Sequence, residues 1–195
     1  YGASTDVSLR AYLKKYGLEP DRDVKILQMG GQPEIVAGMQ AGVVQGGILT
    51  SPADFRAKKA GFVMLANFAK EGIDYPTTSL VSTRSTIKKD RETVKRFLMA
   101  YSEAVDRLFR DKELGIRILG KWTRTQDRET LESSYEYATN FVERPPRLPF
   151  KATENIVASM AETDPRAKDH KVEEFIDPSI YNELEKSGFF KSLGR

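Results

Sequence analysis

The sequence predicts an α/β fold in which one doubly wound lobe is followed by a helical C-terminal region. In the first third of the chain, short apolar runs at 24–29, 43–49 and 62–66 alternate with helical patterns and glycine turns. This alternation is typical of a parallel sheet with helices on its faces. After Asp90, apolar residues recur at helical spacing almost to the end of the chain. The two blocks divide near residue 75.

The first helix is expected directly after an opening turn. Apolar residues recur at helical spacing up to Gly17, which supplies a stop. Ser4 or Thr5 is expected to cap the N-terminus of this helix. Asp6 would complement the positive end of the helix dipole.

Two further helices and a lone strand are expected before the helical block. Pro33 opens one helix, and Gly42 closes it. The segment Ser51–Asp54 resembles a capping box with proline at the first helical position, and Gly61 ends the helix that follows. The run at 78–83 is expected to be a strand.

The remainder of the chain is expected to be helical. Asp90 can cap a long amphipathic helix whose apolar face includes Phe97 and Leu98. Shorter helices are expected at 114–122, 128–141, 154–162 and 179–187, with a proline-rich bend at 144–149. Trp122 lies on one of these amphipathic helices and is expected to be part of the core.

The composition excludes several kinds of chemistry. The 195 residues include no cysteine and one histidine, His170. Thiol catalysis, disulfides and Cys/His metal sites are therefore excluded, and neither a metal nor a cofactor is expected. A Ser–His–Asp triad would depend on His170, which lies in a polar, loop-like stretch. Basic and acidic residues are interleaved with a net charge of +3, so no nucleic-acid partner is expected. No apolar run is long enough to span a membrane.

Three strand-to-helix turns are expected to meet at one edge of the predicted sheet. They lie at 2–5, 30–32 and 50–53. Right-handed crossovers place such turns at the carboxyl ends of the strands, which is where open α/β sheets bind ligands. Each turn would present the amide groups of a helix N-terminus, which favour anionic or polar groups. The three turns are therefore the predicted ligand site.

A series of short motifs in a fixed order supports this prediction. The motifs are Gly2–Asp6, Leu9–Arg10, Gly17–Pro20, Gly30–Gly31, Ala37–Gly42, Gly47–Pro52, Lys59–Phe62, Tyr75–Pro76, Ser79–Arg84, Asp177–Pro178 and Gly188–Phe189. Together they resemble the second lobe of type II periplasmic binding proteins. The most similar group is the branch that binds sulfonates, nitrate and thiamine-pyrimidine precursors. The resemblance covers nearly the whole chain.

The resemblance implies a particular domain organisation. In that family two α/β lobes close over a ligand, and the chain crosses between them twice. Residues 1–76 would form the second lobe, without its first strand, and residues 77–195 would form a crossover strand and helices that belong to, or pack on, the first lobe. The sheet of the first lobe would lie outside this sequence. Residues after about Thr78 are then expected to pack on chain outside the sequence, on a second copy or on the first 75 residues. The strand at 78–83 is not expected to pair with the three earlier strands.

The resemblance also implies a function. The chain would be the extracytoplasmic or periplasmic solute-binding component of an ABC importer, and not an enzyme. It would bind a small anionic or polar heterocyclic ligand and work with a permease. It would reach the membrane only through that permease or a lipid anchor. The implied ligand-binding residues are Ser4, Thr5, Gly30, Gly31, Gln32, Ser51, Pro52, Thr77 and Thr78. Tyr75 would lie at the hinge. Several of these residues could instead serve only as helix caps or tight turns.

Two alternatives remain at this point. The effector-binding domain of a LysR-type regulator shares the type II fold. A thiamine-pyrimidine synthase belongs to the same branch, but the cysteine-rich motif associated with that chemistry is absent. Sulfonate, nitrate, a pyrimidine and an aromatic acid all remain candidate ligands.

Overall fold

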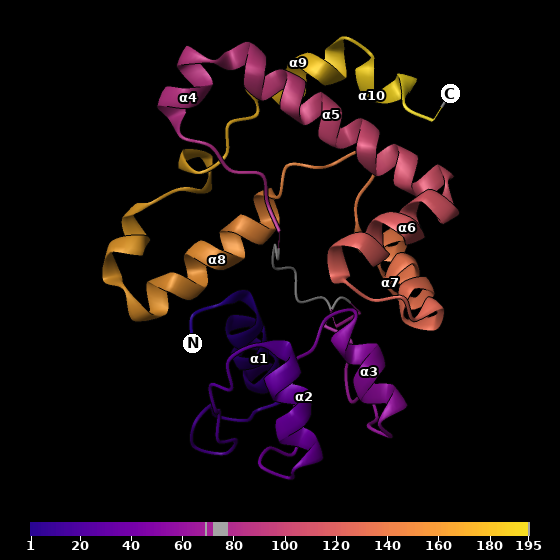
Figure 1. Cartoon of the computed structure of the whole chain (residues 1–195). Helices are drawn as coiled ribbons and strands as arrows, with labels where there is room; N and C mark the ends of the chain where they lie inside the picture. The colour runs from indigo at the N-terminus through magenta and orange to yellow at the C-terminus, as the bar shows by residue number, and fades with distance from the viewer. Residues whose placement is uncertain (69, 72–77, 195) are drawn as a thin grey trace.

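The computed structural model describes residues 1–68, 70, 71 and 78–194 (Figure 1). In the first third of the chain, extended segments join α1 (Ser4–Lys15), α2 (Gln32–Gln40) and α3 (Ala53–Lys59). All three helices were predicted. Gly17, Gly42 and Gly61 follow their ends with φ of 74°, 71° and 90°. Glycine adopts this left-handed backbone without strain, so the predicted stops are confirmed.

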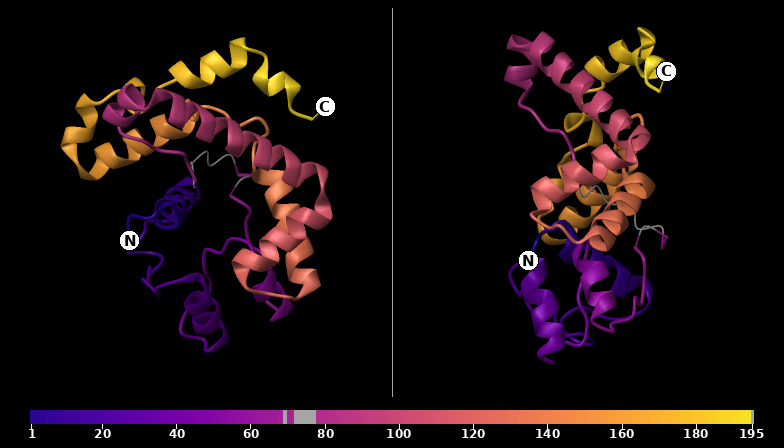
Figure 2. Two further views of the ribbon diagram at one scale, coloured as in Figure 1. Left: turned by 45° about the horizontal axis from the view of Figure 1, so that its top comes forward. Right: turned by 45° about the vertical axis from the view of Figure 1, so that its right-hand side comes forward.

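The rest of the described chain is also helical. Its elements are α4 (Arg84–Lys89), α5 (Arg91–Arg110), α6 (Lys112–Thr123), α7 (Arg128–Phe141), α8 (Phe150–Thr163), the short 3₁₀ helices η1 (Pro165–Asp169) and η2 (Val172–Glu174), α9 (Ser179–Lys186) and α10 (Phe189–Ser192). The predicted long helix and the four shorter ones are confirmed, whereas α4 was not expected. Asp90 occupies the N-cap position of α5, but its side chain makes no capping hydrogen bond. Figure 2 shows these helices curving around α1, α2 and α3.

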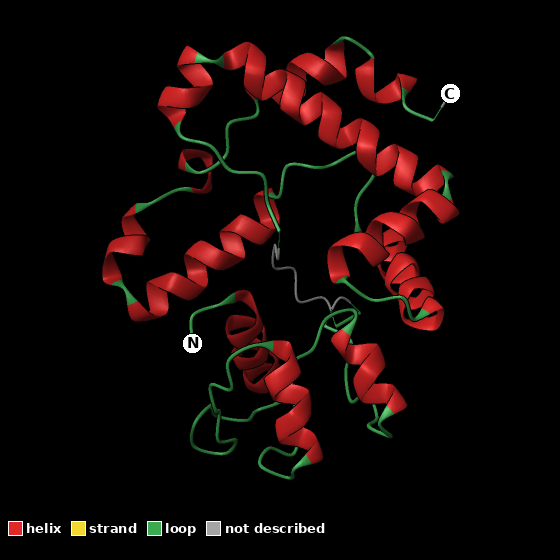
Figure 3. Ribbon diagram, in the orientation of Figure 1, coloured by secondary structure: helices red, strands yellow, loops and turns green. Residues whose placement is uncertain are grey.

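The predicted α/β sheet is wrong. Figure 3 shows helices and loops, and the described residues contain no strand. The one β-bridge found there joins Pro20 and Val24. Residues 24–29, 43–49 and 62–66 form loops between or after helices, with bends at 43 and 45. The described part of the chain therefore has a helical fold and not a doubly wound lobe.

Two of these connections, 24–29 and 43–49, pack on α2. A Cβ atom built on Gly38 of α2 would lie 2.7 Å from Met29 Cε and 3.5 Å from Val44 Cγ2, so both flanking segments lie against this helix. Gly47 similarly lies against Ile35 of α2. The apolar pattern predicted extended backbone, but a strand also needs a neighbour to complete its hydrogen-bond ladder. These segments pack against α2 and have no neighbouring strand among the described residues.

Two predicted strands are strongly exposed. Val63 and Leu65 in one segment are 79% and 87% exposed, and Val81 in the other is 90% exposed. Within the described residues, 78–83 forms no ladder with the three earlier segments. The expected packing of this segment on chain outside the sequence, or on a second copy, stays a prediction.

An apolar cluster lies between α6 and α7. Ile116, Leu131 and Tyr135 are buried there, with Leu108 packed against them. The Tyr135 hydroxyl donates to the Leu108 carbonyl at 2.9 Å. A Cβ atom on Gly115 would lie 2.7 Å from the Tyr135 ring, so the small residue allows the two helices to approach closely. This cluster fixes the hairpin of α6 and α7.

Trp122 is not part of this core. Its side chain is 77% exposed, contrary to the prediction. Trp122 follows Ile116 by six positions, which is about 240° around an α-helix. The two side chains therefore project from different sides of α6. The apolar spacing correctly predicted that α6 is an amphipathic helix. It did not determine which of the apolar side chains of α6 would be buried.

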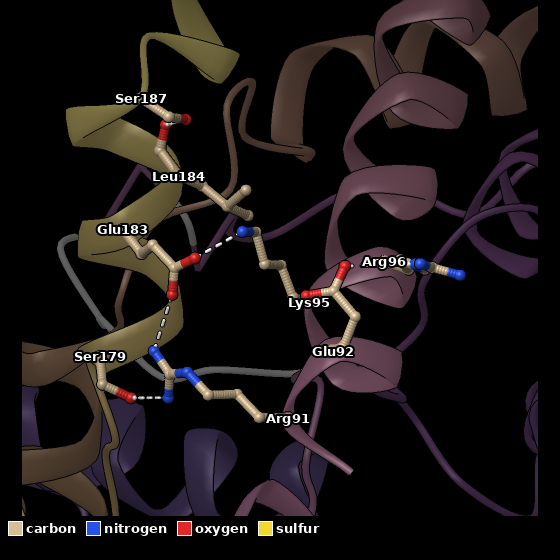
Figure 4. Close-up of polar contacts among 8 residues, drawn as sticks. All are labelled: Arg91, Glu92, Lys95, Arg96, Ser179, Glu183, Leu184 and Ser187. Atoms are coloured by element: carbon tan, nitrogen blue, oxygen red, sulfur yellow. Dashed lines mark hydrogen bonds and ion pairs between the residues drawn. The ribbon is translucent and has the colours of Figure 1, made fainter.

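A charged network joins α9 to α5 (Figure 4). Arg91 donates to Glu183 at 2.9 Å and to the Ser179 hydroxyl at 3.0 Å. Lys95 donates to the other carboxylate oxygen of Glu183. The hydrogen bonds from Lys95 and then Arg91 hold the pKa of Glu183 below its ordinary value. Glu183 thus links two residues of α5 that lie one turn apart.

Replacing Glu183 by glutamine should change how stability depends on pH. A carboxyl group whose pKa is lower in the folded state stabilises the fold above its unfolded pKa, which is about 4.5. That contribution is lost as the pH falls through the lower, folded value. The stability gap between wild type and Glu183→Gln should therefore be present at neutral pH and close below about pH 4.5. Urea unfolding across this range measures it. Glu92→Gln, which removes an exposed pair on α5, is the control; a gap for Glu183→Gln that is independent of pH would contradict the linkage.

Candidate functional site

The opening turn places Ser4 and Thr5 in the first turn of α1. Ala3 occupies the N-cap position and there is no side-chain cap, so the prediction that one of the hydroxyls caps this helix is wrong. Both residues are half-buried, and neither hydroxyl has a hydrogen-bond partner among the described residues. The Gly2 amide donates to Asp6 at 2.7 Å. Both hydroxyls thus remain available to a ligand.

The charge of Asp6 is compensated within the turn. Arg10 Nε donates to Asp6 Oδ1 at 2.8 Å, one helical turn along α1, and Arg10 also pairs with Asp21. The chain terminus ties this turn to the next segment: the Tyr1 amino group donates to Gln28 at 2.9 Å, and the Tyr1 hydroxyl donates to the Ile26 carbonyl at 3.0 Å. The opening turn therefore lies beside the segment that leads into the second turn.

The second turn is formed by Gly30 and Gly31. Gly30 has a φ of 94°, which favours glycine, and Gly31 is the N-cap of α2. A Cβ atom on Gly31 would lie 2.7 Å from Glu34 Oε2, so the Glu34 side chain folds back over the turn. Glu34 forms no ion pair within the described residues. The turn thus presents a carboxylate as well as backbone amides.

Gln32 joins the second turn to the third. Its side-chain amide donates to Thr50 Oγ1 at 2.8 Å, and its carbonyl oxygen accepts from the Thr50 amide at 2.9 Å. Two hydrogen bonds to one residue fix the orientation of the side chain as well as its position. The structure therefore brings together two of the three turns that the sequence predicted to converge.

The third turn begins α3 without the predicted capping box. Pro52 is the N-cap, and no side-chain cap is present. The Ser51 hydroxyl donates instead to Ser134 on α7 at 3.1 Å. Nearby, Lys59 pairs with Glu129 at 2.5 Å, so α3 and α7 are also joined by charge. Nothing in the sequence around Ser134 marked it as a neighbour of this turn.

Asp54, in the first turn of α3, carries a buried carboxylate oxygen. Its Oδ1 atom has no hydrogen-bond partner among the described residues. Burial raises the pKa of Tyr137 on α7, and the charge of Asp54 raises it further. A buried acceptor without a donor costs about 1–3 kcal/mol, and a ligand or an ordered water commonly supplies the donor. The third turn therefore has the capacity to accept a hydrogen bond.

The structure describes only one of the three residues predicted at the crossover. Tyr75 and Thr77 lie outside the described residues, and Thr78 is exposed with no hydrogen bond in the described part. Just before the crossover, Glu71 accepts from Lys15 at 2.9 Å and from Tyr16 at 2.8 Å at the end of α1. The hydrogen bond to Glu71 raises the pKa of Tyr16 to about 12. The chain is thus anchored on α1 shortly before residue 72.

One hollow of the described surface lies away from these turns. A cavity of about 320 Å³ is formed between α8 and the segment that follows it. It is lined by Val157, Met160, Asp164, Arg166, Ala167, His170 and Phe175. His170 is half-exposed and pairs with Glu174 at 3.0 Å. No pattern in the sequence indicated this cavity, because its walls come from apolar positions of α8 and from a polar loop.

The described residues contain neither a cluster suited to a metal ion nor a helix suited to crossing a membrane. In the described part of the chain, no group of three or more His, Cys, Asp or Glu residues is placed to hold a metal ion. None of its helices has the length and apolar character needed to cross a bilayer.

Hydroxyls, backbone amides and carboxylates lie at the starts of α1, α2 and α3, and such groups form hydrogen bonds with polar molecules. The family profile described as NMT1-like matches residues 1–115, which is more than half of the 195-residue chain and includes all three turns. The chain belongs to the NMT1-like family. This membership supports the resemblance to the branch that binds sulfonates, nitrate and thiamine precursors, and with it a solute-binding function of the ABC type. No curated protein and no solved structure matched the chain.

Proposed function

We propose that this chain is the extracytoplasmic solute-binding component of an ABC importer. Its ligand binds at the turns that precede α1, α2 and α3, and a permease receives it. The observation that carries the proposal is the bridge between Gln32 and Thr50, which joins two of these turns inside the region that the family profile covers. The hydroxyls of Ser4 and Thr5 supply polar contacts from the opening turn.

Among the candidate ligands, the charges of the site favour a polar heterocycle with N–H groups. The Glu34 carboxylate lies over Gly31, and the Asp54 carboxylate begins α3. Both would repel a sulfonate, a nitrate or an aromatic acid, because like charges at short range destabilise each other. An N–H group would instead satisfy the unpaired oxygen of Asp54.

Thermal-shift measurements on the whole chain test both statements. The probes are an aminopyrimidine, methanesulfonate, nitrate and benzoate. A ligand at about 100 times its dissociation constant adds about 2.7 kcal/mol to the stability. We expect stabilisation by the aminopyrimidine and not by the three anions. Stabilisation by an anion alone would reject the ligand class but keep the binding function, whereas recovery of a chemically altered probe would contradict reversible binding.

Removing the hydroxyls of the opening turn should weaken binding without weakening the fold. Ser4→Ala and Thr5→Ala should each reduce affinity by about 1–2 kcal/mol, as expected for a lost hydrogen bond. Their melting temperatures should not change, because neither hydroxyl has a partner in the described part of the protein. Titration calorimetry with the bound probe measures the effect. Ser187→Ala is the control, since it removes a hydroxyl after α9 that donates to the Leu184 carbonyl and belongs to none of the three turns, so affinity should not change. Unchanged affinity in both single variants and in the double variant would remove this turn from the site.

A further inference from the structure

The exposed side of α6 carries a distinct strip of side chains. Ile118 and Trp122 lie one turn apart and are 41% and 77% exposed. Arg117 and Lys121 form a parallel row beside them, and Arg124 follows at the C-cap. Trp122 is the single tryptophan of the chain. We call these five residues the α6 strip.

The α6 strip carries more positive charge than nearby carboxylates compensate: Glu113, one turn before Arg117, interacts with it only through its charge, without an ion-pair contact. Between Glu113 and Asp127 the chain contains three basic and no acidic residues, a surplus equal to the +3 of the whole chain. None of the three cations forms an ion pair within the described residues. The Lys121 amino group lies 5.7 Å from the centre of the Trp122 ring, which leaves its charge intact.

The acidic residues nearest in sequence are already paired elsewhere. Asp127 and Glu129 bind Lys59 of α3. Glu113 binds Arg128 at 2.6 Å. These pairs hold the carboxylates on other basic side chains, so the strip presents a net positive surface next to an exposed indole.

The backbone at Arg124 supports a role for its side chain. Arg124 has a φ of 53°, a left-handed conformation that favours glycine. Glycines follow the ends of α1, α2 and α3 in such conformations, but α6 ends with an arginine. Glycine would relax the backbone here, but it would remove the cation.

We propose that the α6 strip binds an anionic phospholipid surface. Cations flanking a tryptophan on one side of a helix are the usual composition of contacts with charged headgroups, where the amphipathic indole is also stable. A stable protein interface needs roughly 20–30 residues a side, far more than the five of this strip. Insertion of one indole among lipid headgroups needs no complementary partner shape. This contact goes beyond solute binding, and it differs from the expectation that the membrane is reached only through a permease or a lipid anchor.

The fluorescence of Trp122 reports on the strip directly, because no other tryptophan contributes. Vesicles of equimolar phosphatidylcholine and phosphatidylglycerol should shift the emission of the whole chain to the blue and carry the protein down on sedimentation. Vesicles of phosphatidylcholine alone should do neither. Binding should weaken as salt is added, since the Debye length shortens.

Variants separate this contact from non-specific attraction. Lys121→Gln and Arg124→Gly should each reduce the partition coefficient about fivefold, the usual contribution of one basic residue near an anionic membrane. Arg124→Gly should keep or raise the melting temperature, which excludes unfolding as the cause. Trp122→Ala should weaken sedimentation with the vesicles. Lys88→Gln with Lys89→Gln removes two exposed charges from α4 and should affect partition less than Lys121→Gln with Arg124→Gly.

Three outcomes would overturn the proposal. They are no blue shift with the anionic vesicles, equal binding to both kinds of vesicle, and equal loss in the α4 and α6 double variants. A blue shift with poly-glutamate but not with anionic vesicles would also reject a lipid surface and assign the strip to an acidic polypeptide.

Discussion

Leu184→Ala should destabilise the protein by about 2–5 kcal/mol, the range found when a buried leucine is truncated in a core. Leu184 on α9 is 1% exposed. It extends from α9 toward α5 beside the ion pairs of Glu183 (Figure 4). Truncation removes its apolar contacts and leaves a cavity that rigid helices cannot fully close.

Urea unfolding followed by circular dichroism measures this loss. Leu65→Ala is a matched control, because it makes the same chemical change at a side chain that is 87% exposed. It should change the free energy of unfolding by no more than about 0.5 kcal/mol. Similar losses in the two variants would show that α9 does not pack on α5 in solution as it does in this structure.

Asp106→Asn should destabilise the protein by about 3 kcal/mol. The Asp106 side chain is 2% exposed, and its carboxylate interacts with three donor groups. Arg110 pairs with it at 2.7 Å, Arg144 donates at 3.3 Å, and the Gly194 amide donates at 3.2 Å. It thereby connects α5 to the bend before α8 and to the C-terminal segment. Asparagine keeps the shape but loses the charge and one acceptor. The loss should lie at the lower end of the range for buried pairs, because both arginines are partly exposed and can regain water.

Two further variants test whether this destabilisation comes from the loss of the buried ion pair. Glu103→Gln makes the same acid-to-amide change at an exposed position of α5 and should have little effect. Arg144→Ala combined with Asp106→Asn should destabilise less than the sum of the two single variants, since both remove the same pair. Strict additivity would mean that Asp106 and Arg144 do not interact in solution.

The sequence predicted most of the longer helices of the described chain and several of their ends, although α4 was not among them. The helix at Arg128–Phe141 was predicted with its observed bounds, and the long helix after Asp90 was also found. The glycine stops at Gly17 and Gly61 were confirmed. These features depend on residues within a few positions of each other, so helical spacing and backbone freedom in the sequence are sufficient to predict them.

The sequence did not determine the sheet, because pairing depends on residues that are distant along the chain. The run at 62–66 has the composition of a buried strand, yet Val63 and Leu65 are exposed and unpaired within the described residues. The N-cap of α1 was likewise not determined by local composition. Ser4 has the side chain of an N-cap, but Ala3 occupies that position. Local composition limits which conformations a residue can adopt. Long-range packing determines which of them it adopts in the folded protein.

For the candidate site, the sequence indicated the three turns, and only the tertiary structure showed how they are connected. Gln32 and Ser51 were predicted site residues and Thr50 lay in the predicted third turn, but neither the pairing of Gln32 with Thr50 nor the contact of Ser51 with Ser134 was predicted. The exposure of Trp122 likewise depended on which side of α6 meets α7. A hydrogen bond between Ser51 and a residue 83 positions away exists only because α3 and α7 are brought into contact. The chemistry of each turn is local and can be predicted from the sequence, whereas the meeting of turns and helices is set by long-range packing.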